Sequence, residues 1–128
     1  MARTNYPSGA KWEDIVGYSR AVKAGNLVEV SGTVAVDEFG NTVGIGKAYE
    51  QTLFILQKIG KALETAGSCQ ADVIRTRIYV TDISNWPEVA RAHAETYGEV
   101  RPASTLIEVS RLVDSSFLVE IEATALIP

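Results

Sequence analysis

The chain has very little of the residues on which disulfide and metal chemistry depend. Its 128 residues include a single cysteine, Cys69, and a single histidine, His93. One cysteine excludes a disulfide within the chain, and one histidine in a segment of helical spacing argues against a metal cluster. We therefore expect Cys69 to be a loop thiol and His93 to be a packed or solvated side chain. We expect neither a metal nor another cofactor.

Long apolar runs and an excess of positive charge are also missing. No run approaches the roughly 20 apolar residues that span a bilayer, and residues 1–14 lack the apolar stretch of a secretory signal. We therefore expect a cytoplasmic protein without a membrane partner. The formal net charge is −4, whereas proteins that bind a phosphate backbone usually present a basic face. A nucleic acid is therefore an unfavourable partner.

What the chain does have is the composition of a folded globular protein. Hydrophobic residues make up 46% of the sequence and charged residues 22%, which argues against disorder. The length is close to that of one compact domain. No linker, repeat or low-complexity tract divides the chain. We expect residues 1–128 to form a single domain.

The first half of the chain shows strand patterns and then a helical pattern. Ala24-Gly25-Asn26 separates two strand-like runs, and Gly and Asn tolerate the positive φ of a hairpin turn. After the turn, valines alternate with other residues at period two, as they do in a strand: Val28, Val30, Val34 and Val36. Residues 48–66 then switch to helical spacing, and Gly67 is a suitable stop. The apolar stripe of this helix comprises Leu53, Leu56, Ile59 or Gly60, and Leu63.

The second half repeats the change from strand to helix before it ends in strands. Residues 72–82 alternate in polarity, and one predicted face carries Ile74, Thr76, Ile78 and Val80. Residues 84–98 indicate a second helix, which Asn85 can cap and Gly98 can end. Two further strands follow, at about 104–112 and 117–126.

This order of elements predicts an α+β fold with one mixed sheet and two helices packed on one face. Two helices cannot cover both faces of a sheet of five or six strands. By strand parity, the other face carries charges of both signs together with leucines: Glu29, Arg75, Arg77, Leu106, Glu108, Leu118, Glu120 and Glu122. Two interpretations stay open. The face is either solvated or an oligomer interface, and clefts between subunits are common ligand sites.

Three segments resemble signature segments of the Rid/YjgF family of reactive-intermediate imine and enamine deaminases, also called the endoribonuclease L-PSP or translation-inhibitor family. They read GYSRAVKAGNLVEVSG, TRIYVTDISNW, and RPASTLIEVSRL followed by FLVEIEA. The resemblance spans about Tyr18 to Ala125. It implies a chorismate-mutase-like fold in a homotrimer with a barrel-like centre, and small-molecule clefts where subunits meet. It also implies hydrolysis of enamines and imines, such as 2-aminoacrylate, to keto acids and ammonia.

The resemblance also implies roles for individual residues. Glu120 matches the family glutamate that positions the attacking water, and Tyr18 matches a tyrosine at the edge of the cleft. Ser31 and Gly32 match a segment whose backbone lines the cleft. Each residue also has a purely structural interpretation: an interface salt bridge for Glu120, packing for Tyr18, and a bulge for Gly32.

The chain departs from the family pattern where the substrate carboxylate binds. The family has an arginine two positions after the proline of the last segment, and Ser104 stands there, followed by Thr105. A guanidinium presents paired donors that match the two oxygens of a carboxylate. Arg101 lies roughly 10 Å earlier along an extended strand and at odd parity, so it reaches the cleft only if the chain bends at Pro102. The family's asparagine in the second helix is replaced by Ala90.

The sequence therefore leaves two functions of different classes open. The first is an enzyme that hydrolyses imines, enamines or related reactive nitrogen metabolites, with Glu120 directing water. Its substrate preference would differ from 2-aminoacrylate, because Ser104 and Thr105 offer hydroxyls in place of a charged clamp. The second is a non-catalytic or regulatory trimer that binds a small metabolite in the same clefts. An endoribonuclease role ranks third, because the chain is acidic and shows no basic patch.

Overall fold

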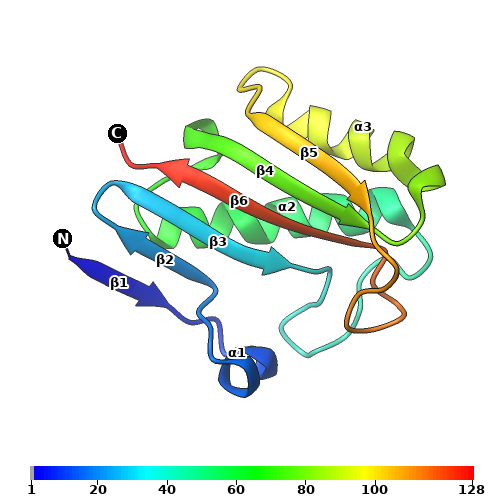
Figure 1. Cartoon of the computed structure of the whole chain (residues 1–128), viewed down its shortest axis with the longest axis horizontal. Coiled ribbons are helices and arrows are strands. Elements are labelled where there is room, and N and C mark those ends of the chain that lie inside the picture. Colours follow the sequence, from blue (N-terminus) through cyan, green and yellow to red (C-terminus); the bar gives the residue numbers. More distant parts are fainter. Residues whose placement is uncertain (1) are drawn as a thin grey trace.

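The strands of the protein form one mixed sheet of six strands. The structure is a computed structural model that describes residues 2–128. The strand order across the sheet is β1-β2-β3-β6-β4-β5. The strands are β1 (Arg3–Tyr6), β2 (Ala21–Ala24), β3 (Leu27–Thr33), β4 (Val73–Val80), β5 (Ala103–Glu108) and β6 (Val119–Leu126). Neighbouring strands run antiparallel except β4 and β5, which are parallel. Figure 1 looks onto the sheet from the side that carries no long helix.

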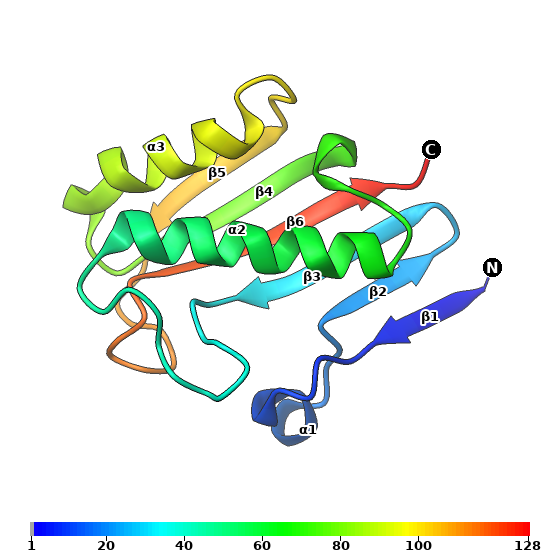
Figure 2. The ribbon, with the colours of Figure 1, turned by 180° about the vertical axis from the view of Figure 1, so that it is seen from behind.

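Two long helices cover the other side of the sheet, as Figure 2 shows. They are α2 (Ala48–Thr65) and α3 (Trp86–Tyr97), and α3 lies in the connection between the parallel strands β4 and β5. The predicted α+β architecture is thereby confirmed. Three short helices, α1 (Lys11–Val16), η1 (Gln70–Asp72) and η2 (Ile83–Asn85), complete the described elements. The sequence patterns did not predict β1 or α1. We call the side of the sheet opposite α2 and α3 the open face.

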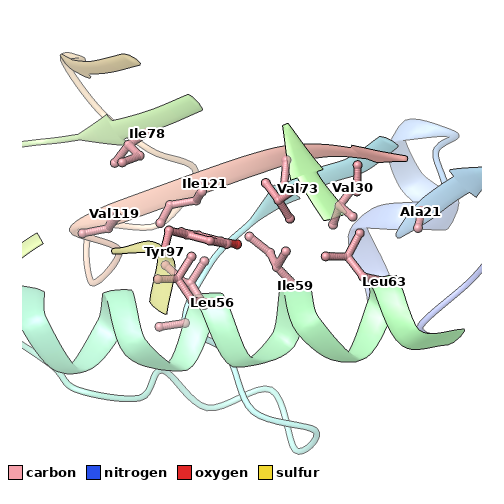
Figure 3. Packing of buried hydrophobic residues seen from close by; sticks show 14 of the residues in the cluster. Ala21, Val30, Leu56, Ile59, Leu63, Val73, Ile78, Tyr97, Val119 and Ile121 are labelled. Carbon is pink, nitrogen blue, oxygen red and sulfur yellow. The ribbon is translucent and has the colours of Figure 1, made fainter. Parts of the chain in front are cut away.

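The hydrophobic core lies between α2 and the helix side of the sheet. Leu56, Ile59 and Leu63 point from α2 toward Val30 and Ile121 on the central strands (Figure 3). The predicted stripe is thus confirmed in these three residues, whereas Leu53 is only half-buried. Each such aliphatic side chain contributes roughly 1.5–3 kcal/mol on burial, which fixes α2 against the sheet.

A bulge in β3 moves the alternation of buried residues. Val30 is opposite Ala123 and Thr33 is opposite Ile121, so Ser31 and Gly32 together face a single residue of β6. Thr33 and Ala35 are therefore buried, and Val34 and Val36 are half-buried. The predicted alternation holds for Val28 and Val30 and is wrong beyond the bulge.

Strand β4 contains a second irregularity, between Val73 and Arg75. Val73 is buried, and the extra residue Ile74 is 45% exposed. The prediction that Ile74 shares the buried face with Thr76, Ile78 and Val80 is therefore wrong for Ile74 and confirmed for the other three.

The side chains of β5 alternate in the opposite sense to the prediction. Ser104, Leu106 and Glu108 are in register with Thr76, Ile78 and Val80, which lie on the helix side. Residues in register on parallel strands point to the same side of a sheet, so these three also face the helix side. The prediction that Leu106 and Glu108 lie on the open face is therefore wrong. Thr105 and Ile107 point to the open face instead.

One buried glutamine on α2 holds two loops. Gln51 is fully buried, and its Nε2 donates hydrogen bonds to the carbonyls of Gly44 (3.2 Å) and Ser116 (2.9 Å). Its Oε1 accepts from the backbone N–H of Leu118 at 2.9 Å. Because buried backbone groups need partners, this amide fixes the start of α2 against the segment that leads into β6.

We predict that Gln51→Leu lowers the free energy of unfolding by about 1–3 kcal/mol, because three backbone groups of half-buried residues lose their hydrogen-bond partner. Urea denaturation at equilibrium measures the change. Gln57→Leu, at an exposed position of the same helix, is the control and should change stability by less than about 0.5 kcal/mol. Equal effects of the two substitutions would contradict the prediction.

Candidate functional site

Glu120 lies on the open face of β6, directly against the bulge in β3. A Cβ atom placed on Gly32 would overlap Glu120 Oε2, so the carboxylate occupies space that only a glycine leaves free. Burial raises the pKa of Glu120, the charge of Arg20 opposes this, and the charge of Glu122 adds to it. The bulge therefore holds a half-buried carboxylate that takes up a proton more readily than an exposed one.

Arg20 connects this region to Tyr18. Its Nη1 donates to the carbonyl of Gly32 at 2.9 Å and to Thr33 Oγ1 at 3.0 Å. Its Nη2 donates to the hydroxyl of Tyr18 at 3.3 Å, and its Nε lies 3.8 Å from Glu13 Oε2. The arginine therefore braces the bulge and the tyrosine at once.

The sequence interpretation missed Arg20. Arg20 follows Tyr18 by two residues, and side chains two apart in an extended segment share a face. This spacing is the signal that could have found it.

Tyr18 and Ser31 line one concave surface, which encloses a volume of about 470 Å³ and also includes Arg3, Glu13 and Ser19. Ser31 Oγ donates to the carbonyl of Ser19 at 2.6 Å, which ties β3 to the segment before β2. The surface lies where α1 meets the first strands. It has both polar donors and carboxylates in reach of a small ligand.

The other predicted site residues lie at the opposite edge of the sheet. Strands β6 and β4 separate β3 from β5, which carries Ser104 and Thr105. Thr105 Oγ1 accepts a hydrogen bond from Arg75 Nη2 at 2.9 Å on the open face. Arg101 has a φ of 53°, so the chain does bend beside Pro102. Its Nε, however, donates to the carbonyl of Gly98 at 3.0 Å, at the end of α3.

A comparison with known families shows to which family the chain belongs. The model of the family described as endoribonuclease L-PSP matches residues 9–127. The chain belongs to this family, which is also called Rid/YjgF. The family membership expected from the sequence segments is thereby confirmed.

Individual relatives in the Rid/YjgF family are similar along most of their length. A RutC family protein of Pyrococcus horikoshii is 37% identical over 108 residues, which cover 84% of this chain and 85% of the relative. The 3-aminoacrylate deaminase RutC of Acinetobacter baylyi is 36% identical over 108 residues, with coverage of 84% and 85%. A crystal structure of a YjgF family member from Mycobacterium tuberculosis has a TM-score of 0.88 and 46% identity, with coverage of 98% and 99%.

The predicted residues of this Rid/YjgF chain thus form two groups within one copy. The first group, at the β3 bulge and the concave surface beside it, comprises Tyr18, Ser31, Gly32 and Glu120. The second group, at the β5 edge, comprises Arg101, Ser104 and Thr105. Among residues 2–128, no three His, Cys, Asp or Glu side chains are close enough to hold a metal ion. No helix within this range is long and apolar enough to cross a membrane.

We predict that Glu120→Gln stabilises the folded protein at about pH 7 and that the gain disappears as the pH falls below about 4. Because the pKa of Glu120 is raised on folding, ionisation costs stability above the folded pKa and costs nothing below the unfolded pKa. Urea denaturation of both proteins at the two pH values measures the difference.

Glu122→Gln is the matched control, on the same face of the same strand. Glu122 accepts from the hydroxyl of Tyr79 at 3.2 Å and lies 3.6 Å from Arg77 Nε. The control therefore should not gain stability at the higher pH. A pH-independent effect of Glu120→Gln would contradict the assignment of burial as the cause.

Proposed function

We propose that this protein hydrolyses imines or enamines in clefts between the subunits of a homotrimer, with Glu120 as the base that directs water. The observation that carries the proposal is the half-buried carboxylate of Glu120, which lies against Gly32. Burial raises the pKa of this carboxylate. A carboxylate with a raised pKa is a stronger general base than an exposed one. The likeness to the 3-aminoacrylate deaminase RutC supports the same class of reaction.

The proposed chemistry needs one water and no cofactor. An enamine first tautomerises to the imine. Glu120 then accepts a proton from water while the water oxygen attacks the carbon of the C=N bond. The proton held by Glu120 passes to the nitrogen, which gives the neutral carbinolamine. The hydroxyl proton of the carbinolamine then passes to the same nitrogen as the C–N bond breaks. The products are a carbonyl compound and ammonia, so that atoms and charge balance.

A complete cleft in this proposal takes the two groups of residues from two copies of the chain. Glu120 and the β5 edge are separated by β4 within one copy. The open face, which no long helix covers, carries the Arg77–Glu122 ion pair and Ile107, which is 46% exposed. A face that combines charge pairs with exposed apolar side chains suits an interface between subunits. In the trimer, the β5 edge of one copy would lie beside Tyr18, Ser31 and Glu120 of the next.

The preferred substrate in this proposal lacks a free carboxylate. Ser104 stands at the position of the family's carboxylate-binding arginine, and the side chain of Arg101 is directed to the carbonyl of Gly98. A charged hydrogen bond contributes about 1.5–3 kcal/mol. A carboxylate that enters without such a partner is therefore held less well than a neutral group of similar size.

We predict that Glu120→Gln lowers kcat/KM for imine hydrolysis by at least about 100-fold, which is the usual contribution of a general base. In the assay, an amino acid oxidase or an amine oxidase generates the imines in situ, and the release of ammonia is followed over time. Glu122→Gln should stay within about threefold of the wild type, because its carboxylate is engaged with Tyr79 and Arg77. Loss of activity in both variants to the same extent would argue against a specific role of Glu120.

We predict that neutral imines are consumed at least about tenfold faster, in kcat/KM, than 2-aminoacrylate and its imine, because the charged partner is missing. The same assay with paired carboxylated and amidated substrates measures the ratio. Equal turnover of the two substrates, or faster turnover of the carboxylated one, would refute the proposed preference unless Arg101→Ala abolished the turnover of the carboxylated substrate.

A non-catalytic trimer that binds a small metabolite is the second candidate. The replacement of two polar ligand groups of the family, by Ser104 and Ala90, favours it. Binding of a ligand that survives in Glu120→Gln, together with no consumption of any imine in a broad panel, would select this function.

A further inference from the structure

Three side chains near the β5 edge form a continuous hydrogen-bonded chain from the interior to the surface. Thr76 on β4 is fully buried, and its Oγ1 lies 2.7 Å from Ser104 Oγ and 2.9 Å from His93 Nε2. Ser104 is exposed on β5, and His93 is half-buried on α3. We call this arrangement the Ser104–Thr76–His93 chain.

The Ser104–Thr76–His93 chain can present either a hydrogen-bond donor or a hydrogen-bond acceptor at Ser104, its exposed end. Thr76 has one hydroxyl proton, so it donates either to Ser104 or to His93. In the first case His93 Nε2–H donates to Thr76, and Ser104 keeps its own proton to donate outward. In the second case Ser104 donates inward to Thr76, and its lone pairs accept from outside. A neutral imidazole permits both states, because its proton moves between the two ring nitrogens.

A change between these two hydrogen-bond directions requires a neutral imidazole. The surroundings of His93 favour this neutral form. Its ring packs against the ring of Tyr97, with centroids 4.8 Å apart. Burial lowers the pKa of His93, and no charged neighbour contributes to the shift. The titratable group facing it from its own helix is Tyr97, and the strand groups facing it are the two hydroxyls of the chain.

We propose that the Ser104–Thr76–His93 chain is a specificity-determining site that binds a neutral amide or hydroxyl group of the ligand. This inference rests on the proposed function, which places the ligand at the β5 edge, and it names the substrate class as imines that carry an amide or hydroxyl. Such groups both donate and accept hydrogen bonds, and Ser104 can do either at the exposed end of the Ser104–Thr76–His93 chain. A carboxylate only accepts and finds no positive charge in the chain. His93 and Thr76 are positioning residues, because they act through Ser104.

Binding of two product analogues tests the inference without any turnover. Pyruvamide and pyruvate differ only in the amide and the carboxylate. His93 is the only histidine in the sequence, so its imidazole NMR signals identify themselves. We expect the wild type to bind pyruvamide at least about tenfold more tightly than pyruvate, and pyruvamide to shift the His93 signals.

Five variants separate a role in binding from a role in packing. Thr76→Val and His93→Phe keep the shape of the interior, and Ser104→Ala changes an exposed position. Each should weaken pyruvamide binding about fivefold and weaken pyruvate binding less. Thr52→Val, which removes another fully buried hydroxyl, in α2, is the control and should behave as the wild type. Ser104→Arg should reverse the preference in favour of pyruvate.

Failure of the inference is distinguishable from failure of the proposed function. Equal binding of the two analogues, binding of neither, or a preference unchanged in Thr76→Val, His93→Phe and Ser104→Ala would each overturn the inference. A preference of the wild type for pyruvamide that is reduced in the three variants, together with no hydrolysis of any imine, would support the inference and contradict only the proposed catalysis.

Discussion

The close approach of Glu120 to the backbone of Gly32 is the constraint on which the candidate site depends. The bulge at Ser31 and Gly32 brings the backbone of β3 toward β6, and the missing side chain at position 32 leaves room for the carboxylate. The same bulge turns the carbonyl of Gly32 and the hydroxyl of Thr33 toward Arg20, whose guanidinium also holds Tyr18. One irregularity of the backbone therefore sets the position of a carboxylate, a guanidinium and an aromatic ring.

The architecture was predictable from the sequence where periodicity was regular. The stripe on α2 identified Leu56, Ile59 and Leu63 correctly, because long amphipathic helices repeat their pattern over several turns. The two sheet irregularities were not predictable from periodicity, because an extra residue puts the alternation before it out of step with the alternation after it. Ile74 and Val34 were assigned to the wrong side for this reason. The parallel pairing of β4 and β5, which sets the direction of Ser104, is a tertiary property that a local pattern does not contain.

The candidate site was predictable only as a set of residues and not as a geometry. The family resemblance pointed to Glu120, Gly32 and Tyr18, and the structure brings these three into one region together with Arg20. It did not point to His93, because a single histidine on a helix has no motif. The contact of His93 with Thr76 depends on how α3 packs against β4. Long-range packing of this kind is where interpretation of a single sequence ends.

The amide of Gln51 has a consequence for how this chain can change during evolution. One side chain satisfies the carbonyls of Gly44 and Ser116 and the N–H of Leu118, which belong to loops far apart in the sequence. An insertion or deletion in either loop must keep its carbonyl in reach of the same amide. A single substitution at position 51 would therefore release both loops from this constraint at once.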